Sequence, residues 1–266
     1  MRLTILSDNN LSDRRCACEH GLSVWAEVGG KCYLLDTGQG DKFALNARVL
    51  GVDVSRAEAL VVSHGHYDHA GGVLTFHDLA PHADIVMTPS ALRPKYSVSS
   101  VMTKYNGVPD VQSVKALDVR FAEGVCRLGD NVLLFTLPDD APANNHLMIE
   151  SEGGLTPDTF ADELFTLMSE EGRHVLFGGC THHGLEQLLA YVHDVLGIEH
   201  LDAFVGGLHL KGRSSEEIER SIAVARRYDV RRWIVNHCTG NEAIAMWHAA
   251  FGGEPRDGYT GAVVEI

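Results

Sequence analysis

The densest group of metal-binding side chain types in the chain follows a short apolar segment, Leu60–Val62. Three histidines and one aspartate lie within the next stretch of sequence: His64, His66, Asp68 and His69. Imidazole and carboxylate groups are ligands that suit zinc, and a turn after a strand lets alternate side chains converge on one point. His64 and His66 can share one ion, and Asp68 with His69 can face a second position. The spacing therefore predicts a site for one or two divalent metal ions.

Short apolar segments and amphipathic segments alternate along the whole chain. The apolar segments predict strands over Leu3–Leu6, Ser23–Val28, Lys31–Leu35, Leu60–Val62, Ile85–Met87, Val132–Thr136, Val175–Phe177, Leu201–Val205, Trp233–Val235 and Ala262–Glu265. The amphipathic segments predict helices over Asp41–Leu50, Ala70–Leu79, Gly184–Leu196, Ser214–Tyr228 and Asn241–Phe251. Interleaved strands and helices are typical of an α/β domain. The 266 residues, 45% of them hydrophobic, suffice for one domain with a large core.

The segment from about residue 91 to residue 129 interrupts this pattern. It is polar and irregular, and it contains Pro94 and Pro109. Connections of this kind often act as lids or as substrate-binding elements. We therefore expect one domain over residues 1–266 with a lid-like insert at about 91–129. Arg93, Lys95 and Lys104 lie in the insert and could hold an anionic group from above the site.

The charge balance and the cysteines narrow the class of protein. The chain has 22 Lys and Arg against 36 Asp and Glu, a net charge of -14, which argues against a sequence-independent grip on nucleic acid. No apolar run approaches the ~18 residues of a membrane span, and the first residues read as a strand rather than as a secretory signal. Six scattered cysteines indicate free thiols or metal ligands rather than a disulfide framework. We expect a cytoplasmic protein that acts on a small molecule. The protein could also form a homo-oligomer.

Basic residues are scarce, so those near the expected site are informative. His209 follows a predicted strand and should lie at the same edge as the other histidines, as a ligand or as a substrate contact. Lys211 and Arg213 come directly after it and could hold an anionic group of the substrate. His146 is a further candidate site residue.

The pattern His64-x-His66-x-Asp68-His69 after a strand resembles the hallmark of the metallo-β-lactamase superfamily. The resemblance implies a four-layer αββα sandwich whose loops at one edge bind one or two metal ions. It also implies that the metal activates water for attack on the substrate.

Three further segments extend the resemblance, each after a predicted strand. Asp36-Thr37-Gly38 resembles the family segment whose Asp supports the metal loop. Cys180 stands where relatives carry a metal-bridging Asp, and His237 stands where they carry their last metal-binding histidine. Together with Glu19-His20-Gly21, these segments resemble the branch described as metal-dependent hydrolases of β-lactamase superfamily II. Archaeal members of this branch carry the name dihydropterin-methyl-(ribofuranosyl)aminobenzene 5′-phosphate synthase, which implies a transferase step.

Two departures from the family pattern concern the metal ligands. The family segment that normally supplies a further metal-binding histidine is absent. The corresponding window, Thr156–Glu163, contains Asp158 and Asp162, either of which could substitute. Cys180 carries a thiol, which is softer than the carboxylate it replaces and less suited to bridging two hard ions. His182 lies two residues further on, and we favour it over Cys180 as the ligand.

The lead hypothesis is therefore a metal-dependent hydrolase that binds Zn²⁺, with Mn²⁺ or Fe²⁺ as alternatives. Asp68 and His66 would be catalytic, Asp36 and His20 would support the ligands, and the substrate would be held by His209, Lys211 and Arg213. The expected metal ligands are His64, His66, Asp68, His69, His182 and His237, with Cys180, Asp158, Asp162 and His209 as further candidates. A synthase on the same scaffold, a non-catalytic metal protein and a sulfur-oxidising iron enzyme remain alternatives.

Overall fold

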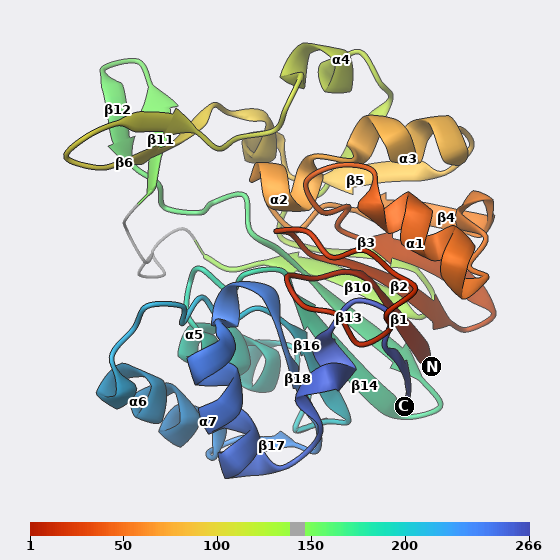
Figure 1. Ribbon diagram of the computed structural model, residues 1–266, viewed down its shortest axis with the longest axis vertical. Coiled ribbons are helices and arrows are strands. Elements are labelled where there is room, and N and C mark those ends of the chain that lie inside the picture. Colours follow the sequence, from red (N-terminus) through yellow and green to blue (C-terminus); the bar gives the residue numbers. More distant parts are fainter. Residues whose placement is uncertain (139–146) are drawn as a thin grey trace.

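Two mixed β-sheets packed face to face form the centre of the computed structural model, which describes residues 1–138 and 147–266 (Figure 1). The first sheet has the order β19-β1-β2-β3-β4-β5-β8, with bounds Val263–Glu265, Arg2–Ser7, Ser23–Val28, Lys31–Leu35, Ala57–Val61, Asp84–Met87 and Val119–Phe121. The second has the order β18-β16-β14-β13-β10-β9, with bounds Trp233–Val235, Ala203–Gly206, Arg173–Gly178, Leu164–Glu170, Val132–Thr136 and Val125–Gly129. Side chains of both sheets, such as Leu3 and Phe177, form one buried core between them.

Helices cover the outer face of each sheet. The first sheet packs against α1 (Lys42–Leu50), α3 (Val73–Leu79) and α4 (Val111–Lys115) through a second apolar cluster. The second sheet packs against α5 (Leu185–Ala190), α6 (Ser215–Ala225) and α7 (Asn241–Phe251) through a third. Each interlayer space therefore has its own core, and the expected four-layer αββα sandwich is confirmed.

The parallel half of each sheet determines where the candidate site can form. In the first sheet β3, β4, β5 and β8 run parallel, and in the second β14, β16 and β18 do so. The loops after β4, β14, β16 and β18 carry most of the candidate residues. Because parallel strands end at the same edge of a sheet, these loops meet at one end of the sandwich.

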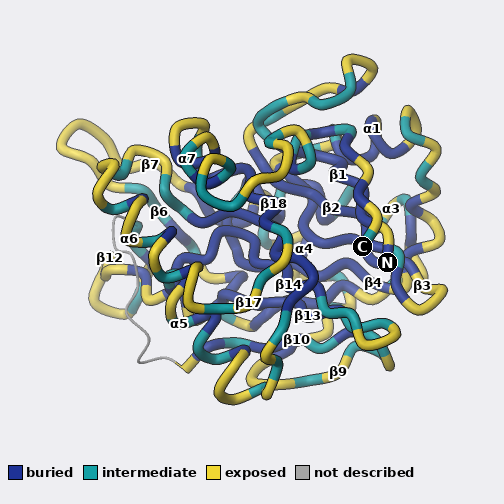
Figure 2. The backbone as a smooth tube through the Cα atoms, turned by 90° about the horizontal axis from the view of Figure 1, so that it is seen from below, coloured by how far each residue is buried: buried dark blue, intermediate teal, exposed yellow. Residues whose placement is uncertain are grey.

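The expected insert does not stay outside the two main sheets. A small sheet of β12 (Gly154–Pro157), β11 (Leu147–Ser151), β6 (Lys95–Val98) and β7 (Thr103–Tyr105) projects from the body (Figure 1). Its outer strands β7 and β12 are exposed, whereas the central strands β6 and β11 are partly buried and each contains one buried residue, Lys95 and Ile149 (Figure 2). The second half of the 91–129 segment instead supplies α4, β8 and β9 to the layers. These elements looked irregular because β8 and β9 are short edge strands with exposed side chains.

The remaining elements are short. They are α2 (Tyr67–Ala70), the 3₁₀ turns Val54–Arg56, Pro89–Leu92, His237–Thr239 and Pro255–Gly258, the π turn Tyr191–Val195, and the paired strands β15 (His200–Leu201) and β17 (Asp229–Val230). All six cysteines are free thiols. None of the described helices is long and apolar enough to span a membrane.

Candidate metal centre

The first group of candidate ligands contains His64, His66 and His182. His64 and His66 come from the loop after β4, and His182 comes from the loop after β14. His64 Nε2 lies 2.9 Å from His66 Nδ1 and 3.3 Å from His182 Nε2. Burial lowers the pKa of His66 to about 3 and lowers that of the other two well below the usual value, so the rings stay neutral. Three neutral imidazoles converge here, within the reach of one ion.

The second group contains His69, His237, Asp68 and His20. His69 Nε2 and His237 Nε2 lie 3.1 Å apart. Asp68 Oδ2 lies 3.1 Å from His20 Nε2 and 3.4 Å from His237 Nε2. His20 is exposed at the mouth of the site, whereas His69 and His237 are buried.

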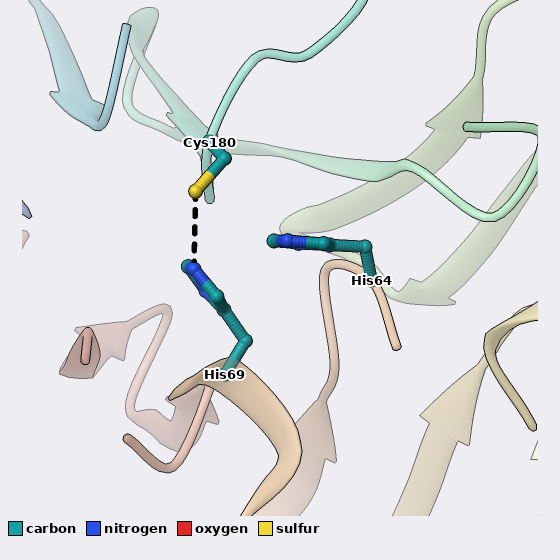
Figure 3. A group of neighbouring side chains, drawn as sticks. All are labelled: His64, His69 and Cys180. Atoms are coloured by element: carbon teal, nitrogen blue, oxygen red, sulfur yellow. Dashed lines mark hydrogen bonds between the residues drawn. The ribbon is translucent and has the colours of Figure 1, made fainter. Parts of the chain in front are cut away.

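Cys180 lies between the two groups. Its Sγ is 3.1 Å from His69 Nε2, and Figure 3 shows its side chain beside those of His64 and His69. The Cys180 sulfur also lies within 4.8 Å of a potential ligand atom of His182, His209, His237 and Cys238. Burial raises the pKa of the thiol well above its usual value. The loop after β14 thus brings both Cys180 and His182 to the cluster, rather than one in place of the other.

Hydrogen bonds fix which nitrogen of each ring faces the cluster. The Ser63 hydroxyl donates to Asp36 Oδ2 at 2.7 Å because a carboxylate oxygen only accepts, so His64 Nδ1 donates to Ser63 Oγ at 2.9 Å. His69 Nδ1 donates to Asp36 Oδ2 at 2.7 Å. These bonds leave the Nε2 lone pairs of His64 and His69 directed toward Cys180. Asp36 thus takes the supporting position that the family resemblance implies.

The same argument orients the ring of His237. His237 Nδ1 lies 3.1 Å from Asn9 Oδ1, an oxygen that also accepts from the backbone of Gly21, so His237 donates there. Its Nε2 then faces His69 Nε2, and two neutral imidazoles cannot hydrogen-bond through these atoms. The gap is suited to a cation: a metal ion, or a proton on His69. Burial would lower the pKa of His69, but the charge of Asp36 outweighs it and raises the pKa.

Several residues at the site have a left-handed backbone conformation. The non-glycine residues Asp36, Thr181, His209 and His237 have φ values of 57°, 53°, 50° and 49°. This conformation costs ~1 kcal/mol or more for most residues, and it persists where the surroundings enforce it, as is common at functional sites. The sharp turns it makes after β3, β14, β16 and β18 aim the side chains inward.

Asp158 and Asp162 do not join the ligand groups. Lys95 Nζ lies 2.6 Å from Asp158 Oδ2 and 3.0 Å from Asp162 Oδ1, and all three side chains are buried. The two carboxylates therefore bind a lysine, and Lys95, one of the basic residues that could have held an anionic group, is inaccessible. Glu163, which was not among the candidate ligands, accepts from the backbone of His182 and His183 and from His183 Nδ1 at 2.6, 3.0 and 2.8 Å.

A cavity of about 310 Å³ opens onto the cluster. Lys104 from β7, Lys211 from the loop after β16 and His209 line it. Its other lining residues are His20, His66, Tyr67, Asp68, Ser97, Asn106, Leu147, Cys180, His182, His237 and Cys238. Arg213 instead lines a neighbouring cavity and lies 3.4 Å from Glu217 Oε1. His146 lies outside the described residues.

Comparison of the sequence and the fold with known proteins shows the family of the chain. The sequence profile of the metallo-beta-lactamase superfamily matches residues 17–156, more than half of the chain. The chain belongs to the metallo-β-lactamase superfamily. The structure of Tm1679, a metal-dependent hydrolase of the β-lactamase superfamily, superposes with a TM-score of 0.87 and 29% identity, covering 100% of this chain and 99% of that one.

Two more distant similarities are informative. A Methanocaldococcus jannaschii protein named 7,8-dihydropterin-6-methyl-4-(beta-D-ribofuranosyl)-aminobenzene-5′-phosphate synthase is 24% identical over 257 residues, 88% of this chain and 85% of that protein. Zn²⁺-bound PqqB from Methylobacterium extorquens shares the fold, with a TM-score of 0.62 and 14% identity over the full length of both chains.

Proposed function

We propose that this superfamily member is a metal-dependent hydrolase of a small, anionic, phosphate-bearing substrate. The observation that carries the proposal is the pair His69 Nε2 and His237 Nε2, which face each other at 3.1 Å with both opposite nitrogens committed as donors. Such an arrangement of lone pairs is unfavourable unless a cation lies between them.

The donor set fits two ions. His64, His66 and His182 would hold one, and His69, His237 and Asp68 would hold the other, with Cys180 within reach of both. A mixture of imidazole, thiolate and carboxylate favours Zn²⁺ over Mn²⁺ or Fe²⁺. When bound, such an ion polarises a carbonyl or phosphoryl oxygen and lowers the pKa of water.

Asp68 is the side chain best placed to orient water. Burial alone would raise its pKa, but the neighbouring histidines His20, His237 and His69 outweigh burial and hold the pKa well below the usual value. The side chain is therefore an ionised carboxylate, which can accept a hydrogen bond from a water molecule in the cavity. His20 holds the same oxygen from the solvent side at 3.1 Å and limits its rotation.

Two lysines support the assignment of an anionic substrate. Lys104 and Lys211 both line the 310 Å³ cavity of a chain whose net charge is -14. Tyr67 and Leu147 add apolar surface. A small molecule with an anionic group and an apolar body matches this lining.

A synthase is the second candidate, supported by the 24% identity to the Methanocaldococcus jannaschii synthase. It would use the same cations to hold a phosphorylated precursor. Product analysis separates the two reactions, because condensation joins two substrates whereas hydrolysis consumes water.

The test is a panel of phosphodiesters, lactones and thioesters assayed with the zinc-loaded protein. For an anionic substrate we expect Lys104→Met and Lys211→Met to raise KM about tenfold or more, with kcat changed less, since a charge-assisted hydrogen bond contributes ~1.5–3 kcal/mol. Lys115→Met, at an exposed position on α4, is the matched control. A protein that holds metal but turns over nothing on the panel would favour a non-catalytic role instead.

A further inference from the structure

The segment Asp158–Glu163 occupies the window in which the family resemblance implies a metal-binding histidine. We propose that this segment and the buried Lys95 are positioning residues that hold His66 and His182 in ligand geometry and so replace the missing histidine. The inference rests on the metal site of the proposed function and concerns how that site is supported.

His66 and His182 differ from the other ligand candidates in their hydrogen bonding. His64, His69 and His237 each donate from Nδ1 to a fixed oxygen. Among the described residues, His66 Nε2 and His182 Nδ1 find no hydrogen-bond partner, although both atoms are buried. Something other than an acceptor must therefore fix the orientation of these two rings.

Phe160 supplies that support. Its ring stacks on His182 with a centroid separation of 3.9 Å and an interplanar angle of 8°. It meets His66 edge to face at 6.0 Å and 84°. Phe160 is fully buried and has a φ of 54°, a backbone conformation that a bulky residue adopts only under constraint. One aromatic ring thus contacts both imidazoles that lack an acceptor.

Lys95 and its two carboxylates hold Phe160 in place. Asp158 Oδ1 accepts from Phe160 N at 2.8 Å while its other oxygen binds Lys95 Nζ. Lys95 Nζ also lies 5.8 Å from the centroid of the Phe160 ring. A buried charge cluster is costly to assemble and strongly disfavours the loss of one partner, which fits a role in fixing one conformation.

Asp162 connects the same cluster to the loop that carries His64 and His66. Its Oδ2 accepts from Gly65 N, between the two histidines, at 2.7 Å, while its Oδ1 binds Lys95. The backbone of Glu163 then leads into β13, and its carboxylate binds His182 N at 2.6 Å. The segment therefore contacts both ligand-bearing loops at once.

Lys95 also belongs to the strand that forms the cavity wall. Its carbonyl oxygen accepts from Asn106 N at 2.9 Å, and the Asn106 carbonyl accepts from Tyr67 N at 3.0 Å. Tyr67 begins α2, which carries Asp68 and His69. The buried cluster thus couples the projecting sheet to the metal loop.

The experiment measures zinc affinity by competition with a chromophoric chelator. We expect Lys95→Met and Phe160→Leu each to weaken binding of the zinc held by His64, His66 and His182 by about 10- to 100-fold, the range found when support of a metal-binding histidine is lost. Lys115→Met and Phe121→Leu, both at exposed positions, should leave affinity unchanged. The visible spectrum of the Co²⁺-substituted protein should change in Phe160→Leu, because ligand geometry sets that spectrum.

Phe160→Leu decides the matter if Lys95→Met fails to fold, since it leaves the charges intact. Wild-type affinity and an unchanged cobalt spectrum in the folded variants would overturn the inference, even if their thermal stability fell. Wild-type protein that binds no metal would instead overturn the proposed function itself. The affinity measurement needs no substrate, so the two failures are distinguishable.

Discussion

The candidate site buries several imidazoles together, and this burial lowers the stability of the folded protein at low pH. The pKa of His66 falls to about 3 because burial penalises the imidazolium ion, and the same cause lowers the pKa of His64 and His182. In the unfolded chain these groups titrate near the ordinary value of ~6.5. Between these values the unfolded state binds more protons than the folded state, so stability falls as pH falls.

We therefore predict that the metal-free protein loses stability between about pH 7 and about pH 5, with each depressed histidine contributing up to ~1.4 kcal/mol per pH unit below its unfolded pKa. His69, whose pKa is raised, does not offset this loss, because its contribution is already complete below its unfolded pKa. Denaturant titrations in the presence of a chelator measure the effect. His66→Gln should flatten the pH dependence, and His82→Gln, at an exposed position, should not. Equal slopes in the two variants would refute the assignment.

At this scale the spacing of the sequence identified the residues with local signatures. His64, His66, Asp68 and His69 are close in the chain, and the structure brings them together. The roles of Asn9 and Phe160 depend on contacts with partners far away in the sequence, and neither residue type signals metal chemistry. Asp158 and Asp162 had the right type but a buried lysine as partner.

The loop between β4 and α2 is the element on which the site most depends. Gly65 separates the two histidines, and a Cβ added there would collide with the backbone of Ala91. The loop therefore packs against the turn at Pro89–Leu92 with no room for a side chain. This contact and the hydrogen bond from Gly65 N to Asp162 together fix the position of the loop.

We predict that Gly65→Ala displaces the loop and lowers the free energy of unfolding by ~1–3 kcal/mol, the usual cost of overpacking, while weakening metal binding. Thermal unfolding and metal content measure the two effects. Gly153→Ala is the matched control, because nothing lies within 4 Å of the added Cβ. A Gly65→Ala protein with unchanged stability and metal content would show that the loop can adjust freely.

The elements were predictable where their pattern was local and strong. The strands Ser23–Val28, Lys31–Leu35, Val132–Thr136 and Trp233–Val235 and the helix Asn241–Phe251 match the expected bounds. The expected helix Ala70–Leu79 is two helices, because Gly71 and Gly72 interrupt it. Strand β13, Leu164–Glu170, was missed, since it is buried on both faces at its start and shows no simple alternation.

The arrangement of the whole molecule explains why so many distant segments meet. Two sheets each end in ligand-bearing loops, so residues from β3 to β18 reach one edge of the sandwich. Three separate apolar cores hold the layers in register. The family resemblance implied this architecture, but the projecting sheet that forms a cavity wall depends on pairing between β6 and β11, far apart in sequence.

The measurement that tests the central claim most directly is metal content per chain by elemental analysis, in wild type, His66→Ala and His237→Ala, with exposed His82→Ala as control. The account predicts about one or two zinc ions in wild type and in the control, with the ion loosened or lost in each site variant. Wild-type protein that neither retains zinc nor takes it up, or site variants that bind as much as wild type, would contradict it.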